Sequence, residues 1–216
     1  MKKIYTLLLF TFGFLLITFS GFSAHIFSGD LEWSHLNGDT FLIQLTVYKD
    51  CNGTPLNTAY IPVTCSTTGD TIAILNINKP APIDVTPICD ASCTRCQTSN
   101  CNFPYGIEKY VFLKQIVLNS STAGSCCKIS MNYGNCCRST TITTGGANKY
   151  FFIEAEFNRC LVDDGPSFIN PPNGIICIGQ NFVFNAGAID TDTNSSGQLL
   201  DSLSYEWASP LEFANQ

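Results

Sequence analysis

The most reactive side chains in this 216-residue chain are its twelve cysteines. Four of them lie in one short segment. Cys89, Cys93, Cys96 and Cys101 are separated by three, two and four residues. Four thiolates so close could bind zinc or an iron–sulfur cluster, but the spacing matches neither the usual ferredoxin pattern nor a zinc ribbon. The pair Cys93-Thr-Arg-Cys96 also has the spacing of a redox motif, which works at a helix start beside a βαβ unit. The surrounding Thr, Ser and Asn residues favour structural disulfides, with metal binding and redox chemistry as alternatives.

The cysteines as a whole fit a disulfide framework, because an even number in an exported chain is typical of oxidising compartments. Two pairs are adjacent in sequence. Successive Cα atoms lie about 3.8 Å apart, below the roughly 4.4–6.8 Å of a disulfide. We therefore expect each adjacent cysteine to bond outward to a separate partner. The residues expected in disulfides are Cys51, Cys65, Cys89, Cys93, Cys96, Cys101, Cys126, Cys127, Cys136, Cys137, Cys160 and Cys177.

A second set of candidate ligands lies near the end of the chain. Asp190, Asp192, Asn194 and Asp201 occupy positions 1, 3, 5 and 12 of a calcium-loop pattern. Ser195 stands where such a loop has its turn glycine, and Asp201 replaces the usual bidentate glutamate. The alternative is a polar turn, because Asp, Asn and Ser favour turns through local hydrogen bonds. We expect no cofactor unless these residues bind calcium.

Catalytic patterns are nearly absent. The only histidines are His25 and His35, and there is no nucleophile elbow, zinc-protease motif or phosphate-binding loop. Glu154 and Glu156 could act as paired carboxylates on one strand face, but a solvated face explains them better. We expect no catalytic residue and no enzyme.

The first residues have the order of a secretory signal peptide. Lys2 and Lys3 precede an uncharged run over 4–19, and small residues then allow cleavage after Ser23 or Ala24. A membrane anchor is the alternative, but it needs about 20 apolar residues. Removal of the leader changes the formal charge from -6 to -8, which argues against nucleic acid or anionic lipid as partner. No later segment is apolar enough to span a bilayer.

Alternation of apolar and polar residues dominates the rest of the chain and predicts an all-β protein. Phe41, Ile43, Leu45 and Val47 share one strand face, and Asn37-Gly38 before them is a strong hairpin signal. The predicted strands are Ile26–Leu36, Phe41–Tyr48, Thr71–Ile77, Tyr110–Leu118, Lys128–Tyr133, Tyr150–Phe157, Phe182–Phe184 and Ser202–Trp207.

These strands group into a disulfide-stapled antiparallel β-sandwich followed by a partial immunoglobulin-like β domain. The predicted units are a signal peptide over 1–23, a cysteine-rich sandwich over 24–162 and an incomplete domain over 163–216. An immunoglobulin-like sandwich needs about seven strands and roughly 100 residues. We therefore expect the last 50 or so residues to form a partial sheet, and the protein to continue into further domains.

Several segments resemble the N-terminal region of gliding-motility-associated or adhesin-like surface proteins of the Bacteroidetes. The segments that carry the resemblance are Ala24-His25-Ile26, Gly29-Asp30-Leu31, Leu45 to Cys51, Phe103 to Glu108, Asn135 to Arg138, Pro166 to Ile178, and Gly187 to Tyr205. The last is similar to a D-x-D-G-D-S-L-x-Y segment, from which residues 193–200 depart as an insertion. Members of that group often carry PKD or other immunoglobulin-like modules and a type IX secretion signal.

This resemblance implies a non-catalytic structural and adhesive module at the outer cell surface, secreted and acting in adhesion or gliding motility on an unknown surface ligand or glycan. The alternative is a carbohydrate-binding module, since aromatic residues make up 12% of the chain. A flat exposed row that includes Trp33, Tyr48 or Tyr60 would favour sugar stacking, whereas buried rings would favour a scaffold.

The calcium hypothesis predicts a measurable stabilisation. Binding to the folded state alone adds about 2.7 kcal/mol at 100 times the dissociation constant. We expect millimolar calcium to raise the melting temperature, as followed by circular dichroism, with magnesium as the control. An unchanged melting curve would favour the polar turn.

Overall fold

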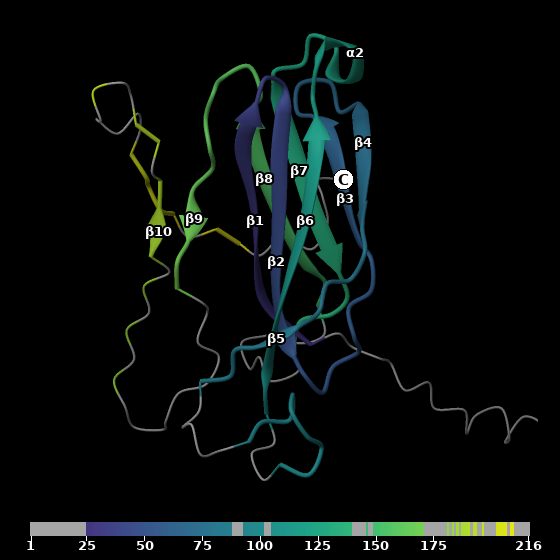
Figure 1. Ribbon diagram of the computed structural model, residues 1–216, viewed down its shortest axis with the longest axis vertical. Helices are drawn as coiled ribbons and strands as arrows, with labels where there is room; N and C mark the ends of the chain where they lie inside the picture. Colours follow the sequence, from purple (N-terminus) through teal and green to yellow (C-terminus); the bar gives the residue numbers. More distant parts are fainter. Residues whose placement is uncertain are drawn as a thin grey trace, which may run out of the picture.

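The computed structural model describes residues 25–87, 93–101, 105–139, 149–170 and 187–190, with positions 146, 181, 183, 185, 192, 193, 196, 202–206, 208 and 209. The predicted signal peptide lies outside these residues, as does most of the predicted strand Phe182–Phe184. The fold is all-β and antiparallel, as the sequence predicts. Within the described residues, two four-stranded sheets and a separate two-stranded ladder form it. The two four-stranded sheets face each other as the layers of a sandwich (Figure 1).

The first sheet has the strand order β1-β2-β6-β5. Its long strands β1, β2 and β6 are paired along most of their length, whereas β5 pairs with two residues of β6 only. The strands are β1 Ile26–Asn37, β2 Thr40–Asp50, β5 Ile83–Asp84 and β6 Ile107–Val117.

The second sheet has the order β4-β3-β7-β8 and lies behind the first in Figure 1. A single helical turn, α2, connects β6 of the first sheet to β7 of the second. The elements are β3 Ala59–Cys65, β4 Thr71–Ile77, α2 Ser120–Ala123, β7 Lys128–Asn135 and β8 Phe151–Asn158.

The core lies between the two sheets and follows from strand alternation. Phe41, Ile43, Leu45 and Val47 of β2 are each at most 1% exposed, because alternate side chains of a strand point to the same side. Ile61 and Val63 of β3, Ile129 and Met131 of β7, and Phe157 of β8 face them from the other sheet in the same cluster. The predicted inward row of the first hairpin is therefore confirmed.

The hairpin turn between β1 and β2 lies one residue later than the sequence pattern indicates. Asn37 pairs with Thr40, so the two turn residues are Gly38 and Asp39. Gly38 has a φ of 51°, a conformation that glycine adopts without steric cost. The glycine therefore supplies the turn, and Asn37 ends the strand.

β3 is not among the predicted strands, because proline in the middle of a run argues against a strand with two neighbours. Pro62 nevertheless lies in β3, opposite Ile74 of β4. Pairing with β7 begins only at Val63. The proline thus lies just outside the part of β3 that has a neighbour on both sides, where its missing N–H is tolerated.

The chain beyond residue 163 runs along the free edge of β1. The Gly165 N–H donates to the Trp33 carbonyl at 2.9 Å, and the Phe168 N–H donates to the Glu32 carboxylate at 3.0 Å. A β-carbon on Gly165 would lie 2.8 Å from the Trp33 indole, so glycine permits this close approach. The segment covers backbone groups that an edge strand otherwise exposes.

The described residues of 163–216 contain only a short ladder, formed by β9 Ser167–Phe168 and β10 Ala188–Ile189. The predicted strand Ser202–Trp207 is wrong for residues 202–206, which have no regular structure. Apolar alternation there is not enough to make a strand, because a strand also needs a partner for its backbone groups. The partial immunoglobulin-like domain stays a prediction.

Two isoleucine variants test the position of the core. Ile43 is fully buried and Ile74 is 56% exposed on β4. We expect Ile43→Ala to lower the free energy of unfolding by about 2–5 kcal/mol, because it leaves a cavity, and Ile74→Ala to have a much smaller effect. Denaturant unfolding of both variants measures this difference, and equal losses would contradict the assignment of the inward face.

Candidate binding pocket at one end of the sandwich

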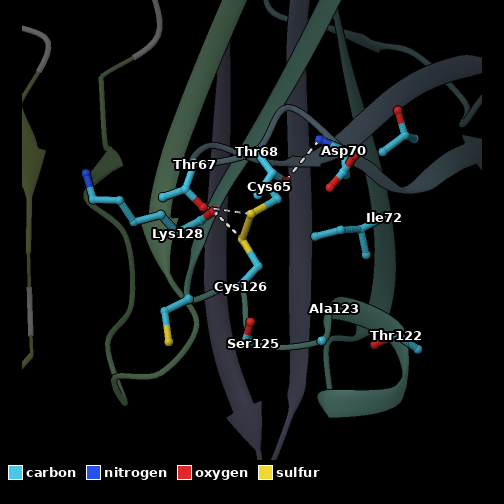
Figure 2. Close-up of a pocket in the computed structure, with 13 residues that line it drawn as sticks. Cys65, Thr67, Thr68, Asp70, Ile72, Thr122, Ala123, Ser125, Cys126 and Lys128 are labelled. Carbon is cyan, nitrogen blue, oxygen red and sulfur yellow. Dashed lines mark hydrogen bonds between the residues drawn. A yellow bond between two sulfur atoms is a disulfide. The ribbon is translucent and has the colours of Figure 1, made fainter.

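A pocket of about 570 Å³ lies where the β3–β4 turn meets the α2–β7 connection. Figure 2 shows the Cys65–Cys126 disulfide in the middle of the lining, with Asp70 and Ile72 to one side and Lys128 to the other. The lining consists of Cys65, Thr67, Thr68, Asp70, Thr71, Ile72, Thr122, Ala123, Gly124, Ser125, Cys126, Cys127 and Lys128.

The β3–β4 turn forms the first wall, and local hydrogen bonds fix its shape. The Cys65 N–H donates to the Asp70 carbonyl at 2.9 Å, and the Gly69 N–H donates to the Cys65 carbonyl at 2.8 Å. Gly69 has a φ of 77°, which side chains rarely tolerate. The Asp70 N–H donates to the Thr68 hydroxyl at 3.3 Å, so hydrogen bonds fix the backbone of Asp70 in the turn.

The α2–β7 connection forms the second wall. Asn119 caps α2, its side-chain oxygen accepting from the N–H groups of Ser121 and Thr122 at 3.0 Å each. Gly124 ends the turn with a φ of 56°. Because α2 has only four residues, the cap satisfies a large share of its backbone donors.

Arg159, which follows β8, stabilises this second wall through hydrogen bonds to its backbone carbonyls. Its guanidinium donates to the carbonyls of Cys126 at 2.5 Å, Leu118 at 2.8 Å and Gly124 at 2.8 Å. Its backbone N–H donates to the Cys127 carbonyl at 2.9 Å. The planar fork of arginine suits such a set of acceptors, so one side chain orders the whole connection.

Two disulfides tie the same region. Cys126 bonds to Cys65 of β3, and Cys127 bonds to Cys160 after β8. This agrees with the expectation that adjacent cysteines bond outward to separate partners. The two bridges close 61 and 33 residues of chain, so they join segments that are distant in sequence.

The second adjacent pair departs from that expectation. Cys136 and Cys137 are bonded to each other. The peptide between them is cis and the Cα atoms lie 3.0 Å apart, shorter even than the trans spacing, so the expectation based on Cα separation is wrong for this pair. The pair ends β7, next to the bridge between Ile26 and Arg138.

Three of the four clustered cysteines are bonded. Cys93 pairs with Cys101, and Cys96 pairs with Cys51, which follows β2. Sulfurs in disulfides are not thiolates, so Cys93, Cys96 and Cys101 are not metal ligands in this state. Cys89 and Cys177 lie outside the described residues.

The charges around the pocket are unevenly compensated. The Lys128 ammonium lies 3.1 Å from the Glu156 carboxylate across the β7–β8 pair. Hydrogen bonds from Ser66 and Lys128 lower the pKa of Glu156. No described group makes a comparable ion pair with Asp70, so the pocket carries one uncompensated carboxylate among neutral hydroxyl groups.

The predicted calcium ligands are described only in part. The Asp192 carboxylate accepts the Asp164 N–H at 2.6 Å, and the Asp190 carboxylate accepts the Asp192 N–H at 3.2 Å. Asn194 and Asp201 lie outside the described residues. Among the described residues, no three His, Cys, Asp or Glu side chains are arranged to hold a metal. Calcium binding stays a prediction.

The aromatic rings named as possible sugar platforms do not form a row. Tyr48 is 4% exposed, and Trp33 stacks on Phe157 with ring centroids 5.3 Å apart. Gly165 also lies against the Trp33 indole. Tyr60 alone of the three is well exposed, at 61%.

The pair Glu154 and Glu156 lies on the exposed side of β8, as the sequence predicts. Each carboxylate has a partner on β7, because Ser130 donates to Glu154 at 2.7 Å and Lys128 contacts Glu156. Of the histidines, His35 donates its backbone N–H to Asp164, and its ring lies at 5.2 Å from the Phe41 ring. These contacts are structural.

A second acidic pair, which the sequence analysis does not single out, lies on β1. The Glu32 carboxylate accepts from Gln44 at 2.9 Å as well as from the Phe168 N–H. Burial and the neighbouring Glu32 raise the pKa of Asp30 from 3.8 to about 6, while Lys109 acts in the opposite direction. Asp30 in turn contributes to a raised pKa of Tyr48, after burial of the ring.

Apart from its cysteines, the pocket residues are missing from the sequence-based candidates, because hydroxyl side chains in turns are common and unspecific. The useful signal is that Cys65 and Cys126 each lie beside a run of Thr, Ser and Gly. Only the pairing of these two cysteines shows that the runs are neighbours.

Comparison of the chain with protein-family models, curated proteins and solved structures finds no match. Within the described part of the chain, no helix has the length and apolar character needed to cross a bilayer.

Removal of the Arg159 guanidinium should loosen the second wall of the pocket. We expect Arg159→Met to lower the free energy of unfolding by about 1–3 kcal/mol, because three carbonyls lose a charged donor. Amide hydrogen exchange of residues 118–127 should accelerate. Lys114→Met, on the exposed part of β6, is the control, and equal exchange in the two variants would contradict the role of Arg159.

The Asp30 carboxylate predicts a pH dependence of stability. Its pKa is ordinarily 3.8 and is about 6 in the folded protein, so the folded state binds more protons between these values. The free energy of unfolding should therefore fall as the pH rises from about 4 to 6. Asp30→Asn should flatten this decline and be more stable than the wild type at pH 7, as measured by denaturant unfolding. Asp39→Asn in the exposed β1–β2 turn is the control, and parallel pH profiles for all three proteins would contradict the prediction.

Proposed function

We propose that this protein is a non-catalytic structural and adhesive module of an exported bacterial cell-surface protein, which acts in adhesion or gliding motility. The sequence resemblance to gliding-motility-associated and adhesin-like proteins supports the role. The disulfide framework supports the location, because such bonds persist in oxidising surroundings outside the cytoplasm.

The observation that carries the proposal is the rigid pocket end of the sandwich. A disulfide joins its two walls, a second disulfide ties the adjoining residue, and Arg159 holds three carbonyls of one wall. A surface ordered before binding loses less conformational entropy when a partner binds. Such an end is suited to hold an external ligand under mechanical load.

The chemistry of the lining suits binding better than catalysis. Apart from disulfide sulfurs, its ionisable side chains are Asp70 and Lys128, and Lys128 is paired with Glu156. A hydrolase would need a nucleophile beside a base, or two carboxylates at a matched separation. The lining instead offers hydroxyl groups around one carboxylate.

A carbohydrate-binding module built on an aromatic platform is not favoured by the positions of the rings. Tyr48 is buried and Trp33 is covered by Phe157 and Gly165. Tyr60 remains as a single exposed ring, without the flat row that stacking on a sugar chain requires.

An adhesion assay tests the proposed function. The full chain, exported and oxidised, is displayed on a non-adherent bacterial strain, and cells retained on biofilm matrix under flow are counted. We expect higher retention than for cells that display no chain, and a loss of that gain for the double variant Cys65→Ala and Cys126→Ala. Loss of a native bridge costs about 2–5 kcal/mol, so the variant is tested well below its melting temperature. Equal retention with and without the chain would overturn the adhesive role.

A further inference from the structure

We propose that the pocket between the β3–β4 turn and the α2–β7 connection binds a neutral saccharide unit, with Asp70 as its principal hydrogen-bond acceptor. This inference rests on the proposed adhesive function and names the ligand class of its pocket.

The size of the pocket fits a small ligand. Its volume of about 570 Å³ lies within the roughly 300–1,000 Å³ of typical small-molecule sites. Both walls are fixed by covalent and hydrogen bonds, so the pocket exists before a ligand arrives. One or two sugar rings can enter from the open end of the sandwich.

The polar groups of the lining are unequally engaged within the protein. Thr122 donates its hydroxyl to the Val117 and Asn119 carbonyls at 3.0 and 3.1 Å, so it is occupied. Among the described residues, no hydrogen bond engages the Asp70 carboxylate or the hydroxyls of Thr71 and Ser125. These groups come from both walls, and they can receive and donate hydrogen bonds toward a ligand between them.

The charge of the pocket selects against acidic ligands. Lys128 is paired with Glu156 at 3.1 Å, so Asp70, Lys128 and Glu156 together carry a net negative charge. A carboxylate, sulfate or phosphate on a ligand would be repelled by Asp70. A sugar has vicinal hydroxyls, which can donate to the two carboxylate oxygens in strong charge-assisted hydrogen bonds.

Apolar surface completes the match with a sugar ring. Ile72 is partly buried at the side of the pocket, and Ala123 and the Cys65–Cys126 disulfide lie next to it (Figure 2). The C–H face of a pyranose can pack on this surface while its hydroxyls face Asp70 and Ser125. The arrangement needs no aromatic platform, which agrees with the covered rings of Tyr48 and Trp33.

A glycan array with matched variants tests the inference. The full chain, exported and oxidised, is applied to printed neutral, amino, sialylated and sulfated oligosaccharides, and hits are measured by calorimetry. We expect neutral glycans to bind and acidic glycans to be excluded. Asp70→Asn should weaken binding at least about tenfold, because it removes a charged acceptor. Asp39→Asn removes the same charge from an exposed turn outside the pocket lining and should leave affinity within about twofold.

The outcomes separate this inference from the proposed function. Absence of binding to any neutral glycan, preference for acidic or amino sugars, or full affinity in Asp70→Asn would each overturn the saccharide site. Ser125→Ala on the opposite wall checks the same pocket with a variant that leaves every charge in place, and it should also weaken binding.

If cells that display Asp70→Asn are still retained, and retention also survives periodate oxidation of the matrix, the protein is adhesive but a sugar is not its ligand. Neutral-glycan binding without any cell retention would support the site and overturn adhesion.

Discussion

Cys126 and Cys127 impose the constraint on which the pocket end of the molecule depends. Successive side chains of extended backbone point in opposite directions, so two adjacent cysteines can reach two different segments. Here one reaches the end of β3 and the other reaches the residues after β8. The chain entering β7 is therefore fixed from both sides. The pocket walls, the capped turn of α2 and the contacts of Arg159 all follow from that fixed entry.

An ion pair between a buried lysine and a partly buried glutamate orders the opposite end of the same core. Lys49 continues the inward row of β2, and its ammonium lies 3.2 Å from the Glu108 carboxylate of β6. Tyr110 donates its hydroxyl to that carboxylate at 2.7 Å. Burial and this hydrogen bond raise the pKa of Tyr110. A buried charge needs a partner with good geometry, so these residues specify how β2 and β6 align at this end.

Residues 164–168 are attached to the sandwich by hydrogen bonds to β1. Their contacts combine backbone pairing at Gly165 with carboxylate contacts at Glu32, Asp164 and Asp192. The carboxylates that suggested a calcium loop from sequence include one that holds the backbone of this segment. The structure thus gives Asp192 a structural role, because its carboxylate accepts the Asp164 N–H.

The sequence by itself determined the all-β class, the hairpin of β1 and β2 and the inward row of β2, because alternation of apolar residues is a local property of strands. It also indicated that Cys126 and Cys127 bond to separate partners, but the same argument was wrong for Cys136 and Cys137, which bond to each other. It did not reveal β3, because whether Pro62 is tolerated depends on where a neighbouring strand begins to pair. The pocket could not be predicted from the sequence either. The Thr, Ser and Asp side chains of the two turns line one pocket only because the Cys65–Cys126 disulfide joins these turns. Contacts between residues distant in sequence decide which turns become neighbours, and no local pattern encodes that choice.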